Sequence, residues 1–294
     1  KQDLEIFQSV LNGLDYKVGI VFDEDVQPNC NVTEGWLYQQ IIKSQFWVTN
    51  ISENYIAIDS EIVFLKDFYL SDFMYNDETP YVVMGERKEF LDEAYKLNKV
   101  KTQQDNKGRD MLGSRYYNAV KKIREFIPNN SNKYWDYGTG PYIWSSKVWR
   151  HFNDNYLIPN KLSFTQLALL LNQSNCMSES AIYGEYLLFS GVIPAIPISP
   201  LIKCYHWKEQ KDFDDKYKIS EEDIKLNYLG YALQSNWANS EEIVDIDAGT
   251  PGSVLVAGQF ESANLTLGSH EITNANNAGT VNSFFAEFGP EPVQ

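Results

Sequence analysis

The pattern of apolar and polar positions divides most of the chain into alternating helices and strands. Apolar residues at helical spacing predict helices over residues 3–13, 34–48, 163–173, 179–190 and 219–233. Short apolar runs predict buried strands at 16–22, 55–58 and 81–84, with a further apolar stretch at 62–65. Strands that alternate with helices are typical of an α/β domain with a mostly parallel sheet flanked by helices. We expect this fold class for residues 1–238.

Three further segments have weaker patterns. Residues 88–127 are charged and predict a solvated helical pair. Residues 137–148 predict a glycine turn that leads into an aromatic strand, and 192–201 an extended run punctuated by prolines.

The composition changes near residue 238. Residues 249–294 are rich in Gly, Asn, Thr, Ser and Val and contain short alternating runs, which predict a β unit of three or four strands. So small a unit is marginally stable alone, so we expect it to pack on the rest of the chain or to self-associate. We therefore divide the chain into a domain at 1–238 and a β-rich appendage at 239–294.

The net charge excludes some partners. The chain has 25 Lys and Arg against 40 Asp and Glu, a formal charge of −15, and residues 239–294 contain eight acids with no Lys or Arg. This charge argues against binding to nucleic acid or to an anionic membrane surface. No apolar run is long enough to predict a membrane span. The three cysteines are far apart, which favours a reducing, cytoplasmic location.

The predicted strand Tyr55–Ile58 runs directly into Asp59-Ser60-Glu61. Ligands collect at the carboxyl ends of parallel strands, and two carboxylates at i and i+2 can reach a hard divalent cation there. Through that cation they can reach a diphosphate. The alternative is a solvated acidic turn.

The predicted helix at 34–48 has polar and aromatic side chains three and four residues apart, which places them on one side. An indole, two amides and an ammonium together suit a sugar or a phosphate. The alternative is a core tryptophan with surface glutamines. The residues concerned are Trp36, Gln39, Gln40 and Lys43.

Carboxylates and phenols also gather near the start of the predicted helix at 179–190. Glu179 lies in its first turn after Ser178, with Tyr183 and Glu185 further along. A carboxylate at this position can act as a general base toward a hydroxyl. The alternative is a glutamate that only stabilises the helix start.

His206 follows the extended run and adjoins aromatic residues, although a single histidine is more often structural. The sequence contains no G-x-S-x-G, P-loop or G-x-G-x-x-G motif, so hydrolase and nucleotide-fold signatures of those kinds are absent.

Taken in order, four motifs resemble a family of GT-A-fold glycosyltransferases of bacterial and phage genomes. The matching segments are Gly35–Lys43, Tyr55–Glu61, Gly138–Pro141 and Ser178–Gly184, and the resemblance covers about residues 14–237. It implies a nucleotide-diphosphate-sugar donor, a glycan or other hydroxyl acceptor, and Mn²⁺ or Mg²⁺ as cofactor.

The resemblance also implies roles for single residues. The metal ligands would be Asp59, Glu61 and His206. Glu179 and Glu185 are the candidate catalytic carboxylates. The substrate pocket would be formed by Gly138, Thr139 and Gly140, with Tyr183 and the polar face of the helix at 34–48.

The sequence departs from the family pattern in three ways. Glu61 replaces the second aspartate of D-x-D, and Gly140 is an additional glycine. The sequence also starts at the predicted first helix, so we expect it to lack the first strand of the family's fold, either because it is a fragment or because the donor site is incomplete. We therefore keep an alternative, a non-catalytic binding or structural module on a degenerate transferase fold. A lectin-like role for the aromatic helix face is a third hypothesis. The appendage resembles one unit of the bacterial propeller-type β repeats.

Overall fold

The computed structural model describes most of the first 233 residues and four strands beyond them. The described ranges are 21–28, 30–59, 61–86, 112–129, 131, 133–138, 140–206, 208–233, 254–260, 264–267, 270–273 and 282–288. At 112–117, at 208–209 and beyond 233 the description covers the backbone alone. The predicted helix at 3–13 and most of the predicted strand at 16–22 lie outside these ranges, as do Thr139 and the first part of the 88–127 segment.

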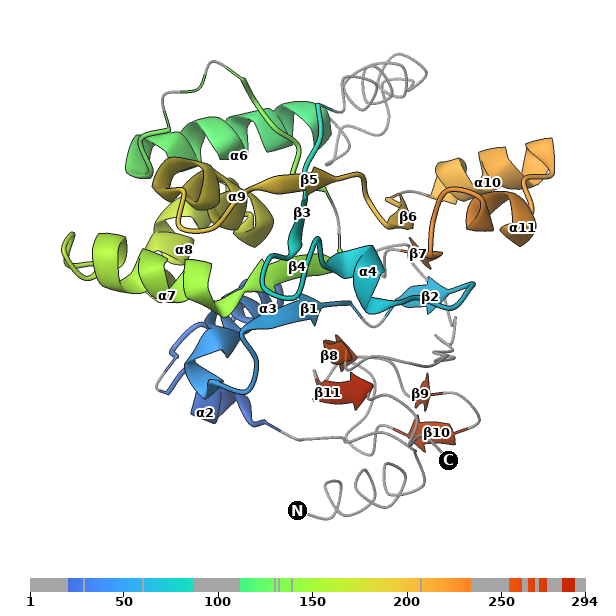
Figure 1. Cartoon of the computed structure of the whole chain (residues 1–294), viewed down its shortest axis with the longest axis horizontal. Coiled ribbons are helices and arrows are strands. Elements are labelled where there is room, and N and C mark those ends of the chain that lie inside the picture. The colour runs from blue at the N-terminus through green and yellow to red at the C-terminus, as the bar shows by residue number, and fades with distance from the viewer. Residues whose placement is uncertain are drawn as a thin grey trace.

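The described elements form a mixed α/β structure (Figure 1). The helices are α2 Asp23–Val26, α3 Gly35–Gln45, α4 Leu70–Phe73, α6 Leu112–Phe126, α7 Ser146–Phe152, α8 Phe164–Asn172, α9 Glu179–Ser190, α10 Lys208–Tyr217 and α11 Glu221–Lys225. The strands are β1 Asn54–Ala57, β2 Ile62–Phe64, β3 Tyr81–Val83, β4 Tyr142–Ser145, β5 Ile196–Ile198, β6 Ile202–Tyr205, β7 Gly230–Leu233, β8 Val254–Phe260, β9 Asn264–Leu267, β10 His270–Thr273 and β11 Asn282–Phe288. Of the helices described, none is long and apolar enough to cross a bilayer.

The prediction of a mostly parallel sheet was wrong. The strands form several small sheets, one in the order β11-β8-β1-β4 and another in the order β2-β7-β6. β1 pairs with β4 antiparallel and with β8 parallel, while β7 pairs with β2 antiparallel and with β6 parallel. Alternation of helices and strands does not fix direction, because a strand that returns after a long connection can enter from either end.

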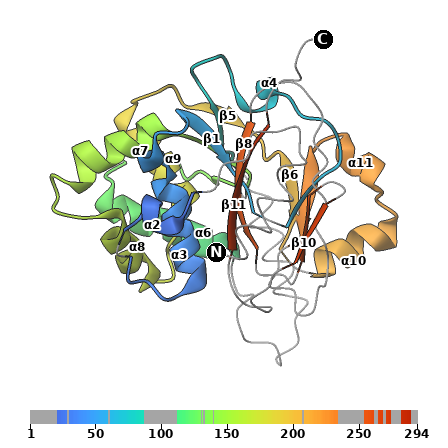
Figure 2. The ribbon, with the colours of Figure 1, turned by 90° about the horizontal axis from the view of Figure 1, so that it is seen from below.

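The helices divide into two groups. In both views α2, α3, α6, α7, α8 and α9 lie on one side of β8, and α10 and α11 lie on the other side (Figure 1, Figure 2). The main core is formed between the first group and the strands β1 and β4. Its members include Leu37 and Ile41 of α3, Trp144 of β4 and Ile182 of α9.

Helix α9 is the central helix of this core. Ser178 caps its start by accepting a hydrogen bond from the Ala181 N–H at 3.3 Å, and Gly191 ends it in the left-handed conformation. Residues 179–187 are all buried, so this part of the helix is surrounded by protein on every side. The carboxylates of Glu179 and Glu185 are therefore removed from water, which is unusual for glutamate.

The β appendage joins the main sheet at the edge of β1. Ile56 pairs with Val256 and Ala57 with Ala257, both in parallel register, and β11 then pairs with β8 along its length. Because an unpaired strand edge exposes backbone donors and acceptors, β8 satisfies groups that β1 would otherwise present. The division into domains at residue 238 stays a prediction, but the two parts share one sheet.

Two predicted elements were wrong. The helix expected at 219–233 ends at Lys225, and β7 begins at Gly230, where a Cβ would overlap the Val63 carbonyl oxygen on β2. The close pairing with β2 therefore decides the structure there, which local helical spacing cannot show. The aromatic strand expected over 137–148 ends at Ser145, and helix α7 starts at the next residue. Helices α7 and α10 were not predicted.

The close contact at Gly230 yields a stability prediction. We expect Gly230→Ala to lower the free energy of unfolding by about 1–3 kcal/mol or more, because the new methyl group must displace the β2 backbone. Gly85→Ala is the matched control, since a Cβ there meets no described atom within 4 Å. Urea unfolding measures both variants, and equal stability of the two would contradict the β2–β7 pairing.

Candidate functional site

An ion pair joins helix α3 to the end of strand β1. Lys43 Nζ lies 2.6 Å from Asp59 Oδ1, and the side chains of Lys43 and Asp59 are 10% and 24% exposed. Lys43 is in the last turn of α3, and Leu37 and Ile41 of the same helix pack in the core and so fix the helix in place. Two motifs that are separate in the sequence thus meet in one contact.

Glu179 is the third charged member of this site. It is 5% exposed and interacts electrostatically with both Lys43 and Asp59. Burial raises the pKa of the Glu179 carboxyl, Lys43 lowers it, and the net pKa lies above the ordinary range. Burial lowers the pKa of Lys43, whereas Asp59, Glu179 and Glu61 raise it. Together the three carboxylates outweigh burial, so the net shift is upward and the ammonium stays charged.

The glycine segment before β4 closes on Asp59. In the antiparallel β1–β4 ladder Ala57 pairs with Tyr142, so two residues further along Gly140 lies opposite Asp59. A Cβ built on Gly140 would lie 3.8 Å from Asp59 Oδ2 and 3.9 Å from the Ala57 carbonyl oxygen. The glycine motif therefore reaches the carboxylate across an antiparallel pair, not along neighbouring parallel strands.

Tyr142 belongs to the site, although it was not among the predicted residues. Lys43 Nζ lies 6.0 Å from the centre of its ring, at the outer limit of a cation–π contact. The ring stacks on Trp144, with centroids 5.2 Å apart and an interplanar angle of 3°. The only sequence signal for Tyr142 was its position directly after the Gly138–Pro141 motif.

The predicted three-ligand metal set is not assembled. Within the residues that the structure describes, no three His, Cys, Asp or Glu side chains are grouped so that they could hold a metal ion. Ile62 and Cys204 both pair with Ala232, so His206 lies at the same edge of the β2-β7-β6 sheet as Glu61. Strand β7 separates them, which puts their backbones about 10 Å apart. The divalent cofactor stays a prediction.

The polar face predicted for α3 divides into two parts. Trp36 is 44% exposed at the start of the helix, whereas Gln40 is buried and donates hydrogen bonds to the Trp36 carbonyl and to Gln39 Oε1, each 3.3 Å long. Gln39 is half-buried. Of this face, Lys43 contacts the charged site through its ion pair with Asp59.

Tyr183 and Glu185, also predicted site residues, contact other parts of the core. Tyr183 is buried against Trp144 and Trp149, and its hydroxyl accepts a hydrogen bond from the Ser145 N–H at 2.9 Å. Glu185 is fully buried and accepts hydrogen bonds from Arg124, Asn129 and Tyr137. Sequence reasoning missed Arg124 and Tyr137, for which no motif gave a signal.

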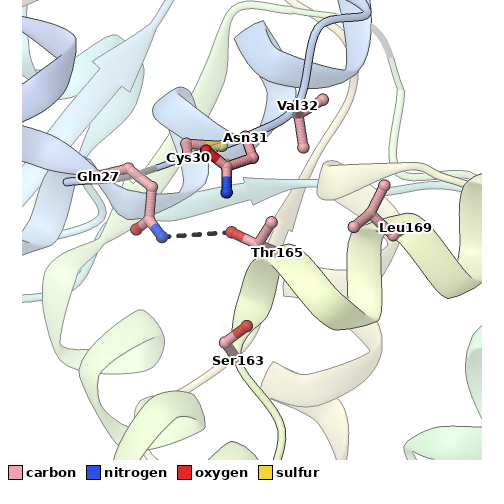
Figure 3. Close-up of a pocket in the computed structure, with 7 residues that line it drawn as sticks. All are labelled: Gln27, Cys30, Asn31, Val32, Ser163, Thr165 and Leu169. Carbon is pink, nitrogen blue, oxygen red and sulfur yellow. Dashed lines mark hydrogen bonds between the residues drawn. The ribbon is translucent and has the colours of Figure 1, made fainter.

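A shallow cavity lies outside this site, between the segment after α2 and the start of α8 (Figure 3). Its volume is about 340 Å³. Gln27 Nε2 donates a hydrogen bond to Thr165 Oγ1 across it, 3.2 Å long. The cavity contains none of the predicted site residues. Its lining residues are Gln27, Cys30, Asn31, Val32, Ser163, Thr165 and Leu169.

Comparison of the chain with protein-family models, with curated proteins and with solved structures found no match. The resemblance to GT-A-fold glycosyltransferases therefore stays a prediction that rests on the four motifs.

The ion pair yields a second stability prediction. Lys43→Met leaves Asp59 and Glu179 without their cation, so we expect the free energy of unfolding to fall substantially at pH 7. The loss should be smaller than the roughly 3–5 kcal/mol typical of fully buried pairs, because Asp59 keeps contact with water. Without Lys43 the pKa of Glu179 rises further, and a protonated carboxyl has no charge to bury. The loss should therefore shrink as pH falls toward about 4.

Lys122→Met is the matched control, because it removes the exposed ion pair with Glu125 on α6. Such surface pairs contribute about 0–1 kcal/mol. Urea unfolding at both pH values gives the comparison. If Lys43→Met lowers the free energy of unfolding by no more than Lys122→Met does, the Lys43–Asp59 pair does not stabilise the fold.

Proposed function

We propose that the protein is a glycosyltransferase of GT-A type that transfers a sugar from a nucleotide-diphosphate donor to a hydroxyl acceptor. One observation carries the proposal: the four motifs that resemble this family come together at the Lys43–Asp59 ion pair. Lys43 ends the first motif, Asp59 lies in the second, Gly140 in the third and Glu179 in the fourth. Four segments from separate parts of the chain would not be expected to converge by chance on one charged site.

The charge of the site supports a divalent cation. Asp59, Glu61 and Glu179 all act electrostatically on Lys43, so three carboxylates stand against one ammonium in the charge balance, a formal charge of −2 when all are ionised. A diphosphate would be repelled here unless a cation bound with it. Mg²⁺ in proteins is commonly held by one or two carboxylates together with substrate phosphates, so Asp59 and Glu61 suffice. The ion would offset charge on the leaving diphosphate.

Glu179 is the residue proposed to handle the proton. An acceptor oxygen forms a bond to the anomeric carbon, the bond from that carbon to the diphosphate oxygen breaks, and the nucleoside diphosphate leaves with the electron pair. The acceptor hydroxyl loses its proton to the Glu179 carboxylate. The raised pKa of Glu179 makes it a stronger base than an ordinary carboxylate, while the charge of Lys43 lowers that pKa and so favours the ionised form.

The first test of this function is donor binding. We expect calorimetry of the full chain to detect a nucleoside diphosphate or its sugar in the presence of Mn²⁺, with little binding when EDTA removes the ion. Asp59→Asn should weaken metal-dependent binding at least tenfold, because one of two carboxylate ligands is lost. Asp77→Asn, at an exposed acid, is the control and should bind like the original chain.

Failure of every common nucleoside diphosphate to bind, with or without metal, would contradict a transferase. It would favour the non-catalytic module instead.

The second test is the pH profile of transfer. Because Glu179 must be ionised and burial raises its pKa, activity should fall on acidification at a higher pH than for a free glutamate, whose pKa is about 4.3. Lys43→Met removes the cation that lowers this pKa, so its acid limb should move to higher pH still. Glu179→Gln should lose transfer while keeping donor binding. A Glu179→Gln variant with an unchanged pH profile would rule out its role as the base.

A further inference from the structure

A buried carboxylate on α9 organises the connection between α6 and β4. Glu185 is 0% exposed, and it accepts hydrogen bonds from Arg124 Nε at 2.7 Å, Asn129 Nδ2 at 2.8 Å and the Tyr137 hydroxyl at 2.6 Å. Arg124 also donates to the carbonyl oxygens of Ser131 and Lys133, at 2.7 and 2.6 Å. The charge is paired and its oxygens are hydrogen-bonded, as a buried ion requires.

Tyr137 connects this network to the glycine segment. Its ring lies against Gly184, where a Cβ would overlap the ring. Its hydroxyl donates a hydrogen bond to Glu185, the next residue of α9. Two contacts from one helix thus fix both the plane and the end of the side chain. Tyr137 immediately precedes Gly138, so the path of the segment toward Asp59 starts from a fixed position.

The glycine segment is held on its other side by Val83 of β3 and by Gly85 beyond the end of that strand. Gly138 has a φ of 71°, in the left-handed region, and a Cβ there would come within 2.5 Å of Val83 Cγ1. Its N–H donates to Asp136 Oδ1 at 2.8 Å, and the Asp136 backbone pairs with Gly85 through two 2.9 Å hydrogen bonds. The segment that reaches Asp59 is therefore anchored at Tyr137, Asp136 and Gly138 together.

From this arrangement we infer that Glu185 is a positioning residue and not a catalytic one. Acting through Tyr137, it fixes Gly138 and so helps to place Gly140 against Asp59, which shapes the donor side of the site. This inference rests on the proposed glycosyltransferase function for its effect on the donor, whereas its structural part does not depend on that function. The described partners of Glu185 already donate two hydrogen bonds to each of its oxygens, so neither oxygen is free to accept a proton from an acceptor hydroxyl.

Tyr137→Phe is the direct test, because it keeps the ring on Gly184 and removes only the hydroxyl contact. We expect faster hydrogen–deuterium exchange in peptides that cover residues 137–142, and a roughly three- to tenfold rise in the donor KM with kcat within about twofold. Tyr186→Phe on the same helix is the matched control, since it removes a buried phenol contact to His151 Nδ1 that is 2.8 Å long. The control should leave both exchange at 137–142 and the donor KM unchanged.

Glu185→Gln separates the two roles for this residue. An amide keeps an acceptor for Tyr137 but removes the charge that pairs with Arg124, so positioning predicts a smaller rise in the donor KM than Tyr137→Phe gives, with the acid limb of the pH profile in place. A large loss of kcat together with loss of that limb would make Glu185 catalytic and overturn the inference. Unchanged exchange and donor KM in Tyr137→Phe would overturn it as well. If the original chain binds no donor, the proposed function fails, and the exchange comparison still decides the structural part.

Discussion

The arrangement of the site depends on a buried cation that holds carboxylates from separate elements. Lys43 is 10% exposed and pairs directly with Asp59, while Glu179 and Glu61 act on it electrostatically. Without the ammonium, the carboxylates on β1 and α9 would repel one another in surroundings that screen charge poorly. Charge balance at Lys43 is thus the condition under which α3, β1 and α9 can pack together.

A second constraint is the antiparallel register between β1 and β4. It brings the residues before β4 to the end of β1, so that Gly140 faces Asp59. Tyr137 and Glu185 then determine how the chain enters this pair. The charged site and the network on the far side of α9 are consequently linked through one short glycine segment. The two carboxylates of α9 contact different parts of this arrangement. Glu179 interacts with Lys43 and Asp59, and Glu185 accepts a hydrogen bond from Tyr137, next to Gly138.

Sequence reasoning recovered elements whose pattern is local. Helices α3, α8 and α9 and strands β1 and β3 were predicted nearly at their observed bounds, because their periodicity and caps are encoded in neighbouring residues. Lys43, Asp59, Gly140 and Glu179 come from four different motifs and lie at one charged site in the structure. Strand direction was not recoverable, since it depends on long connections and not on local pattern. For the same reason the partner of β1's free edge, strand β8, could not be foreseen.

The remaining differences concern side chains whose role comes from contacts distant in sequence. Glu185 and Glu179 have the same residue type on one helix, yet one faces Arg124 and the other Lys43. Tyr183 has a phenol suited to a sugar but uses it to hold the Ser145 amide. Which partner each group meets is decided by tertiary packing, and a single sequence without that packing leaves the choice open.

The most direct measurement is a double-mutant cycle between Lys43→Met and Asp59→Asn, followed by urea unfolding at neutral pH. If the ion pair organises the site, the two substitutions should be strongly non-additive, with a coupling of about 1–3 kcal/mol, because either one alone already breaks the pair. Additive losses within about 0.5 kcal/mol would contradict the account, since the two residues would then contribute independently.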